Sequence, residues 1–235
     1  MPDIRIHSLL DGARQATGAV AVIDVFRAFT TAAVALGQGA ERIIMVSEVD
    51  DALALRQRGL ARLCIGEVGG KAPPGFDFGN SPHEILRAVE AGLDLRGKTL
   101  AQRTGAGTQG IAAAKQGATR LYAAALVTAR ATAQELLASG EDRITLVAMG
   151  NTAVVRTDED ELCAMHIRNL LEGRAGDADA VRHAIMASKE AAWFGDPARP
   201  HMPRGDLDVA LDIDRFDFAV AVSEEDGLSV ARRAP

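Results

Sequence analysis

The sequence predicts an α/β fold in which a largely parallel sheet is covered by helices on both faces. Its 235 residues suit one compact domain or two closely joined lobes, and the 48% of hydrophobic residues is near the globular average. Short β-branched runs alternate with helical patterns as far as Gly150, which is typical of parallel strands joined by crossover helices. After Gly150 helical patterns dominate, which predicts extra helices in the C-terminal third.

The individual elements follow from apolar runs, caps and breakers. Strands are predicted at residues 19–25, 42–46, 62–65, 98–103, 119–124, 143–149 and 218–222. Helices are predicted at residues 28–36, 48–57, 81–91, 107–116, 127–139, 158–171, 178–187 and 207–211. No repeat or linker divides the chain, so we expect one domain over residues 1–235, with a helical C-terminal lobe from about residue 151 as the alternative.

Charge and composition exclude several classes of protein. The net charge of −6 provides no broad positive field, so we expect neither nucleic acid nor a membrane as a partner. No apolar run approaches the length of a membrane helix, and charged residues near the N-terminus argue against a signal peptide. The two cysteines, Cys64 and Cys163, stand in apolar contexts and suggest reduced thiols. We therefore expect a cytoplasmic protein.

Asp24 is the first candidate functional residue, because it comes late in the apolar run at residues 19–25. A buried carboxylate must be paired, hydrogen-bonded or bound to a metal. Ligands of open α/β sheets bind at the carboxyl ends of the strands, and Arg27, Thr30 and Thr31 stand where the next helix begins. Two interpretations are open: an Asp24–Arg27 ion pair that stiffens the turn, and a metal or phosphate site, which we favour.

The loop between the strand at 62–65 and the helix at 81–91 carries further candidates. Glu67 follows the strand, and Asp77, Asn80 and Ser81 come just before or at the start of the helix. Glycines in the loop let the backbone approach a ligand, and a helix start favours anions. A plain loop with a helix cap would explain Ser81. It would not explain two acids and an amide gathered around one connection.

A second glycine-rich connection contains Arg103, Thr104, Gly107 and Thr108, between a predicted strand and a predicted helix. Its backbone N–H groups could form a nest for an anion, with the threonine hydroxyls assisting, and a plain tight connection is the alternative. Residues 92–99 also match the P-loop pattern. There the helix precedes and the strand follows, the reverse of a P-loop, so we interpret the match as a turn.

Acidic residues begin the predicted helix at 158–171. Asp158, Glu159 and Asp160 would be favoured there by the helix dipole alone, and Thr157 with Asp160 is predicted to form a capping pair. Taken by themselves, these acids need no ligand to explain them. The histidines have no metal-ligand spacing, so we expect surface or packing roles for them.

Together these segments resemble the 2-phosphosulfolactate phosphatase family. The resemblance is carried by the run Val-Ile-Asp-Val-Phe-Arg-Ala-Phe-Thr-Thr from Val22, by Gly66-Glu67, by Gly-Phe-Asp-Phe-Gly-Asn-Ser-Pro from Gly75, and by Glu159-Asp160. It implies a three-layer α/β/α fold and a Mg²⁺-dependent phosphatase of sulfolactate and coenzyme M metabolism. The substrate would be a small, strongly anionic phosphate ester.

The resemblance also suggests roles for individual residues. Asp24 and Glu67 would be the first Mg²⁺ ligands and Glu159 and Asp160 the next, because Mg²⁺ prefers hard oxygen ligands. Arg27 would steady the phosphoryl oxygens. We expect Asp24, Arg27 and Glu67 to act in catalysis. The substrate would be contacted by residues of the segments described above, namely Thr30, Thr31, Asp77, Asn80, Ser81, Arg103, Thr104, Gly107 and Thr108.

The chain departs from the family pattern at three places. Val68 stands where the family usually has an arginine, Ala106 where it has an asparagine, and Thr128 where another asparagine is expected. Related phosphorylated 2-hydroxy acids are therefore included as substrates. A non-catalytic anion-binding or regulatory protein and a different metal-dependent hydrolase are the alternatives. Association into a homo-oligomer is left open.

Overall fold

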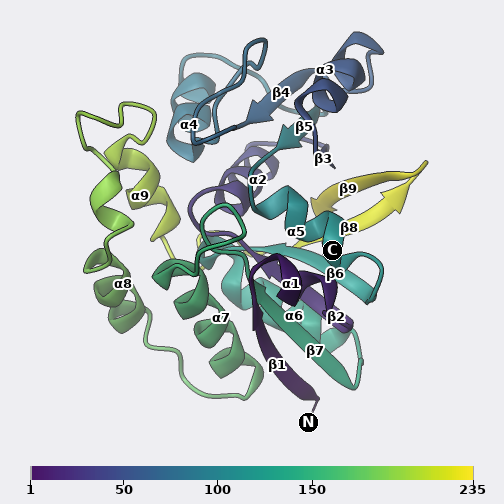
Figure 1. Ribbon diagram of the computed structural model, residues 1–235, viewed down its shortest axis with the longest axis vertical. Helices are drawn as coiled ribbons and strands as arrows, with labels where there is room; N and C mark the ends of the chain where they lie inside the picture. The colour runs from purple at the N-terminus through teal and green to yellow at the C-terminus, as the bar shows by residue number, and fades with distance from the viewer. Residues whose placement is uncertain (1, 235) are drawn as a thin grey trace.

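The computed structural model describes residues 2–234. In this range the protein has a nine-stranded mixed sheet with helices on both faces (Figure 1), which confirms the predicted three-layer α/β/α class with extra C-terminal helices. The strands are β1 (Asp3–Ser8), β2 (Gly18–Ile23), β3 (Arg42–Val46), β4 (Leu63–Gly66), β5 (Thr99–Arg103), β6 (Ala118–Ala124), β7 (Arg143–Ala148), β8 (Val220–Glu225) and β9 (Leu228–Arg233).

The helices lie close to their predicted positions, except that α1 is additional and α9 begins three residues early. They are α1 (Leu9–Arg14), α2 (Ala28–Gly37), α3 (Val49–Gln57), α4 (Pro82–Glu90), α5 (Gly107–Ala114), α6 (Ala129–Ala138), α7 (Asp158–Leu171), α8 (Ala178–Met186) and α9 (Arg204–Ala210). Two 3₁₀ turns, η1 (Leu126–Thr128) and η2 (Ala191–Trp193), complete the helical structure of the described residues.

The sheet consists of two parallel halves joined by an antiparallel hairpin. Its strand order is β1-β7-β2-β6-β8-β9-β3-β5-β4, in which β8 and β9 run antiparallel to each other and to their outer neighbours. The half formed by β1, β7, β2 and β6 and the half formed by β3, β5 and β4 lie at an angle, with α2 and α5 between them and in contact with both (Figure 1). Loops of the two halves can therefore meet.

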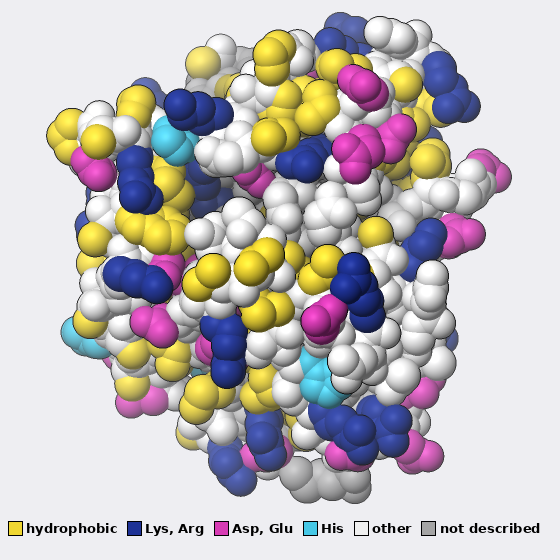
Figure 2. Space-filling view, viewed as in Figure 1, with side chains coloured by type: hydrophobic (Ala, Val, Ile, Leu, Met, Phe, Trp, Pro, Cys, Tyr) yellow, Lys and Arg dark blue, Asp and Glu magenta, His cyan; other side chains and the backbone are white. Residues whose placement is uncertain are grey.

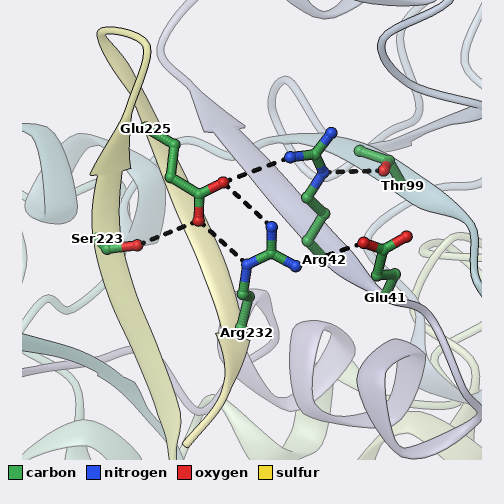
Figure 3. A network of polar contacts seen from close by, with 6 residues as sticks. All are labelled: Glu41, Arg42, Thr99, Ser223, Glu225 and Arg232. Carbon is green, nitrogen blue, oxygen red and sulfur yellow. Dashed lines mark hydrogen bonds and ion pairs between the residues drawn. The ribbon is translucent and has the colours of Figure 1, made fainter.

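Ion pairs attach the hairpin to the smaller half. Figure 3 shows the Glu225 carboxylate of β8 between two guanidinium groups, that of Arg42 on β3 and that of Arg232 on β9. Arg42 Nη1 lies 3.3 Å from Glu225 Oε2, and Arg232 Nε donates to Oε1 at 3.1 Å. Glu41, one residue before β3, lies 3.7 Å from Arg232. These pairs span three strands, so they oppose separation of the hairpin from β3.

Alternation along β2 explains why both faces of the sheet are covered. Val20 and Val22 belong to a buried cluster with α1, α2 and α5, whereas Ala19, Ala21 and Ile23 face α6 and α7. The outer helices α8 and α9 pack against this second cluster. A third, smaller cluster lies under α3. The strand is therefore apolar along its whole length, as expected of a strand buried on both sides.

Two local predictions are wrong. Asp24 does not lie within a strand, because β2 ends at Ile23, and Asp24 is the first residue after it. Thr157 and Asp160 do not form a capping pair, because the Thr157 side chain makes no capping hydrogen bond. Asp160 instead accepts hydrogen bonds from the backbone N–H groups of Val25 and Gly150, at 2.7 and 2.8 Å. It thus ties α7 to the ends of β2 and β7.

Two general properties concern the surface. Basic and acidic side chains are interspersed over the face shown in Figure 2. No helix within residues 2–234 is both long enough and apolar enough to cross a membrane. Strands near both ends of the chain join the same sheet, but the division into one domain or two stays a prediction.

Candidate active site

The candidate site is a cavity of about 380 Å³ at the carboxyl ends of β2, β4, β5 and β7. The loops after these strands provide Asp24, Arg27, Glu67, Gly105 and Ala106, and Asn80 lies beside them. A larger cavity of about 590 Å³ lies elsewhere, along β6, β8 and α6, and includes none of the predicted site residues. The smaller cavity is the candidate site because the catalytic candidates of the two half-sheets meet in it.

Asp24 lies at the bottom of this cavity and is only 6% exposed. Its Oδ1 accepts a hydrogen bond of 3.0 Å from the Ala28 N–H at the start of α2. Burial raises the pKa of Asp24 to about 6; the N–H groups of Ala28 and Gly107 oppose this shift, and the nearby charge of Glu67 adds to it. A positive charge placed between the two carboxylates would relieve both effects.

Glu67 faces Asp24 from the other half of the sheet. Its Oε2 accepts a hydrogen bond of 2.7 Å from the Gly70 N–H, and its Oε1 accepts one from the Gly105 N–H. The carboxylate is thus fixed by two loops, one after β4 and one after β5. Asp24 and Glu67 thus come from different half-sheets and share one cavity. Neither forms an ion pair with a basic side chain of the described residues.

Arg27 is buried, and its main partner is not Asp24. Its Nη1 donates to Asp206 Oδ2 at 2.6 Å and to the His201 carbonyl at 2.8 Å, and its Nη2 donates to the Gly70 carbonyl at 3.4 Å. The Asp24–Arg27 ion pair that the sequence left open is therefore absent, and Arg27 pairs with an acid of α9 instead. Because a guanidinium has five N–H donors, two of them have no partner among the described residues.

The loop from Arg103 to Thr108 is largely occupied by internal hydrogen bonds. Thr104 and Thr108 bond reciprocally, each backbone N–H donating to the other's hydroxyl oxygen, at 3.0 and 3.1 Å. Arg103 donates to the carbonyls of Ser47 and Glu67. With the Gly105 N–H bound to Glu67, three N–H groups of the predicted anion nest already have partners. In this state the loop positions Glu67.

Gly107 is placed where a side chain would not fit. A Cβ atom there would lie 2.8 Å from the Ala28 Cβ, 3.0 Å from Asp24 Oδ2 and 3.0 Å from the Phe29 ring. Such distances are well inside ordinary contact, so Gly107 lets the start of α5 approach the start of α2. The close approach brings the Gly107 N–H toward the Asp24 carboxylate.

Of the other predicted substrate-binding residues, one lines the cavity and four do not. Asn80 lines the cavity, and its buried side-chain oxygen has no hydrogen-bond partner within the described residues. Thr30, Thr31 and Ser81 are buried outside the cavity lining; the Thr30 hydroxyl donates to the Val25 carbonyl, and Ser81 caps α4. Asp77 points away, accepting from the Cys64 N–H at 2.7 Å and pairing with Arg56.

Glu159 and Asp160 are buried near the site but do not line the cavity. Both oxygens of Asp160 are used by the backbone bonds described above. Burial, and then the charges of Glu190 and Asp24, raise the pKa of Glu159 to about 8. Glu159 is therefore a weaker candidate ligand than Asp24 and Glu67, because its side chain does not line the cavity in which those two acids meet.

The acids of the site meet part of what a bound Mg²⁺ ion requires. Over residues 2–234, no group of three or more His, Cys, Asp or Glu side chains is arranged to hold a metal. Mg²⁺ usually binds through one or two carboxylates, and water and substrate phosphate complete its coordination. Asp24 and Glu67, together with the unpartnered Asn80 oxygen, fit this requirement, whereas a complete protein cage is not present.

Sequence reasoning missed the wall of the cavity that the C-terminal segment provides. Trp193, Arg199 and His201 line it, although histidines were expected to have surface or packing roles. Trp193 ends η2, and Arg199 and His201 lie in the loop that follows it, where no local pattern marked them. Asn151 and Thr152 also line the cavity, and their position directly after a predicted strand is a signal that could have found them.

Comparisons with known proteins agree with the resemblance. The family model described as 2-phosphosulpholactate phosphatase matches residues 5–197. A probable 2-phosphosulfolactate phosphatase of Thermoplasma volcanium is 31% identical over 83% of this chain and 85% of its own length. A protein of the same description from Deinococcus radiodurans is 38% identical over 75% of this chain and 70% of its own length. One from Bacillus subtilis is 31% identical over 87% of this chain and 86% of its own length.

Proposed function

Because the chain belongs to the 2-phosphosulfolactate phosphatase family, we propose that it hydrolyses 2-phosphosulfolactate, or a related phosphorylated 2-hydroxy acid, to the hydroxy acid and phosphate, with Mg²⁺ bound. The observation that carries the proposal is the meeting of Asp24 and Glu67, from separate half-sheets, in a cavity that Arg27 also lines. The same proposal includes a role in sulfolactate and coenzyme M metabolism.

Asp24 and Glu67 are the residues that would hold Mg²⁺, with the Asn80 side-chain oxygen as a third hard oxygen in the same cavity. When bound, the ion would neutralise phosphate charge and activate a water. Its charge would also remove the repulsion that contributes to the raised pKa of Asp24. Glu159 and Asp160 are not included in this ligand set, because neither lines the cavity and both oxygens of Asp160 accept backbone hydrogen bonds.

The protein's own residues would orient the ester for attack by water. Arg27, fixed by Asp206, would donate its two remaining N–H groups to the phosphoryl oxygens. Phosphoryl transfer depends mainly on positioning and on stabilising charge, so a preorganised guanidinium is well suited to this role. The attacking water forms the new P–O bond and releases a proton, the ester P–O bond breaks, and the leaving oxygen takes up a proton in balance to become the hydroxyl of the hydroxy acid.

The test is phosphate release from a panel of phosphorylated hydroxy acids, with Mg²⁺, with excess chelator, and after Mg²⁺ is restored. We expect release to stop with chelator and to return with the metal. Asp24→Asn should lower kcat/KM by at least about 100-fold while the protein stays folded, and Asp208→Asn, an exposed acid on α9, should have no effect. Full activity in chelator would contradict the metal proposal, and no release from any ester would favour a non-catalytic anion-binding protein.

A further inference from the structure

One end of the cavity is basic, and two of its three basic residues come from the segment that follows the range matched by the family model. The family model matches as far as residue 197, whereas Arg199 and His201 follow it and line the cavity. The His201 carbonyl accepts the hydrogen bond from Arg27, which attaches this segment to the catalytic loop. The basic end, defined here as Arg27, Arg199 and His201, lies in the same cavity as the acids Asp24 and Glu67.

Hydrogen bonds hold the segment around Arg199 in a compact loop. The Gly195 N–H donates to the Met202 carbonyl at 2.8 Å, and the Met202 N–H donates to the Arg199 carbonyl at 2.9 Å. The Arg199 guanidinium lies 4.9 Å from the centre of the Trp193 ring. A stacked guanidinium on a closed loop loses little freedom when it binds a ligand.

The charge of Arg199 is only weakly compensated. Its Nε lies 3.9 Å from Asp196 Oδ2, a long contact between side chains that are 41% and 40% exposed. Arg27, by contrast, is buried against Asp206 and has most of its donors in use. Of the two arginines that line the cavity, Arg199 is therefore the one whose donors are available to a second acidic group.

The surroundings of His201 support a positive potential at this end. Burial lowers the pKa of His201, and the charges of Arg27, Lys71 and Arg199 lower it further, in that order. No acid contributes to the shift. The buried Nδ1 atom of His201 has no hydrogen-bond partner within the described residues. A neutral imidazole whose Nδ1 atom carries the proton can donate a hydrogen bond to an anionic ligand.

We propose that Arg199 and His201 form a second anion subsite, which binds the carboxylate or sulfonate of the substrate while the phosphate lies at Asp24, Glu67 and Arg27. This inference rests on the proposed function and deepens it by naming the group that selects the substrate. It also bears on the departure at Val68. That side chain is 49% exposed and lies outside the cavity lining, so Arg199 would take over anion recognition from a different loop.

The experiment compares three esters in the wild-type enzyme and in Arg199→Gln. They are 2-phosphosulfolactate, phosphoglycolate with a single carboxylate, and ethyl phosphate, which has a neutral tail. For Arg199→Gln we expect KM to rise about 10- to 100-fold for the two acidic esters, with kcat nearly unchanged. For ethyl phosphate kcat/KM should be unchanged. Arg199→Lys should recover most of the loss, and Arg204→Gln, an exposed arginine outside the cavity, should have no effect.

A binding measurement separates this proposal from the proposed function. Titration calorimetry with sulfolactate, which has no phosphate, should show at least 10-fold weaker binding to Arg199→Gln than to the wild type. If no ester is hydrolysed, the phosphatase proposal fails and this titration decides the subsite alone. Equal affinity of the two proteins, no measurable binding to the wild type, or an equal loss for ethyl phosphate and the acidic esters would overturn the subsite.

Discussion

Replacing Asp206 by alanine should weaken the fold and displace Arg27, because Asp206 is the buried partner of three groups. Its side chain is 0% exposed. It accepts from Arg27 Nη1 at 2.6 Å, from the Ser81 hydroxyl at 2.6 Å and from the His83 N–H at 3.0 Å. These contacts join α9 to the start of α4 and to the loop after β2. One residue of the C-terminal segment therefore orders two loops around the cavity.

The size of the effect follows from burial. Arg27 is 3% exposed, so Asp206→Ala leaves a buried charge without a partner, a change that costs about 3–5 kcal/mol. For a chain of this size each kcal/mol lowers Tm by about 2–4 °C, so we expect a decrease of roughly 6 to 20 °C. Asp208→Ala is the matched control, because its carboxylate is 67% exposed and 3.6 Å from Arg204. It should cost less than about 1 kcal/mol.

Urea unfolding and kinetics on the folded variants provide the assay. Asp206→Asn keeps the shape of the side chain but removes its charge, and it should reduce kcat/KM by about 10-fold or more at a temperature where the protein is folded. Asp208→Asn should leave kcat/KM at the wild-type value. A loss of under 1 kcal/mol for Asp206→Ala, together with normal turnover of Asp206→Asn, would refute the role of Asp206 in positioning Arg27.

Three further changes test other parts of the site. In the folded protein Glu159 stays protonated up to about pH 8, whereas in the unfolded chain it ionises above about pH 4.5. The free energy of unfolding of the wild type in chelator should therefore fall by up to about 1.4 kcal/mol per pH unit between these two values as pH rises. The Glu159→Gln variant lacks this loss, so its free energy of urea unfolding relative to the wild type should increase up to about pH 8. A difference between the two proteins that stays constant with pH would contradict the raised pKa of Glu159. Gly107→Ala should cost about 1–3 kcal/mol and most of the activity, because its Cβ would press on Asp24; an active variant of normal Tm would show that the contact relaxes. Val68→Arg should leave kcat/KM for 2-phosphosulfolactate relative to phosphoglycolate unchanged in a competition assay, because Val68 lies outside the cavity lining, and a raised ratio would mean that an arginine at position 68 reaches the sulfonate.

The sequence predicts the strands that are continuous apolar runs and misses β1 and β9, for a physical reason. Buried strands such as β2 are continuous apolar runs, whereas β1 alternates Asp3, Arg5 and His7 with isoleucines and lies at the sheet edge beside β7. No strand is predicted for β9. The Asp226-Gly227 pair is a sequence signal for the hairpin that ends in β9. Both residues have positive φ, at 50° and 78°, as a tight hairpin turn requires.

The site shows the same limit at longer range. Asp24 and Glu67 could be named from sequence, because each directly follows a strand whose carboxyl end faces the ligand. Asp77 could not be excluded in that way. It stands in the same motif, yet its carboxylate turns back to the Cys64 N–H and Arg56. Asp206 and Arg199 reach the site only through the packing of α9 and its preceding loop, which no local pattern of residues records.

The β8–β9 hairpin makes the geometry of the site depend on residues that lie outside it. Asp24 belongs to one half of the sheet and Glu67 to the other, and the strands that connect the halves are formed by residues 220–233. None of the residues of this hairpin lines the cavity. The hairpin therefore acts as a spacer that fixes the separation of the two carboxylates. During synthesis on the ribosome these residues emerge after both half-sheets, so the two acids acquire their final spacing only once the hairpin has been made.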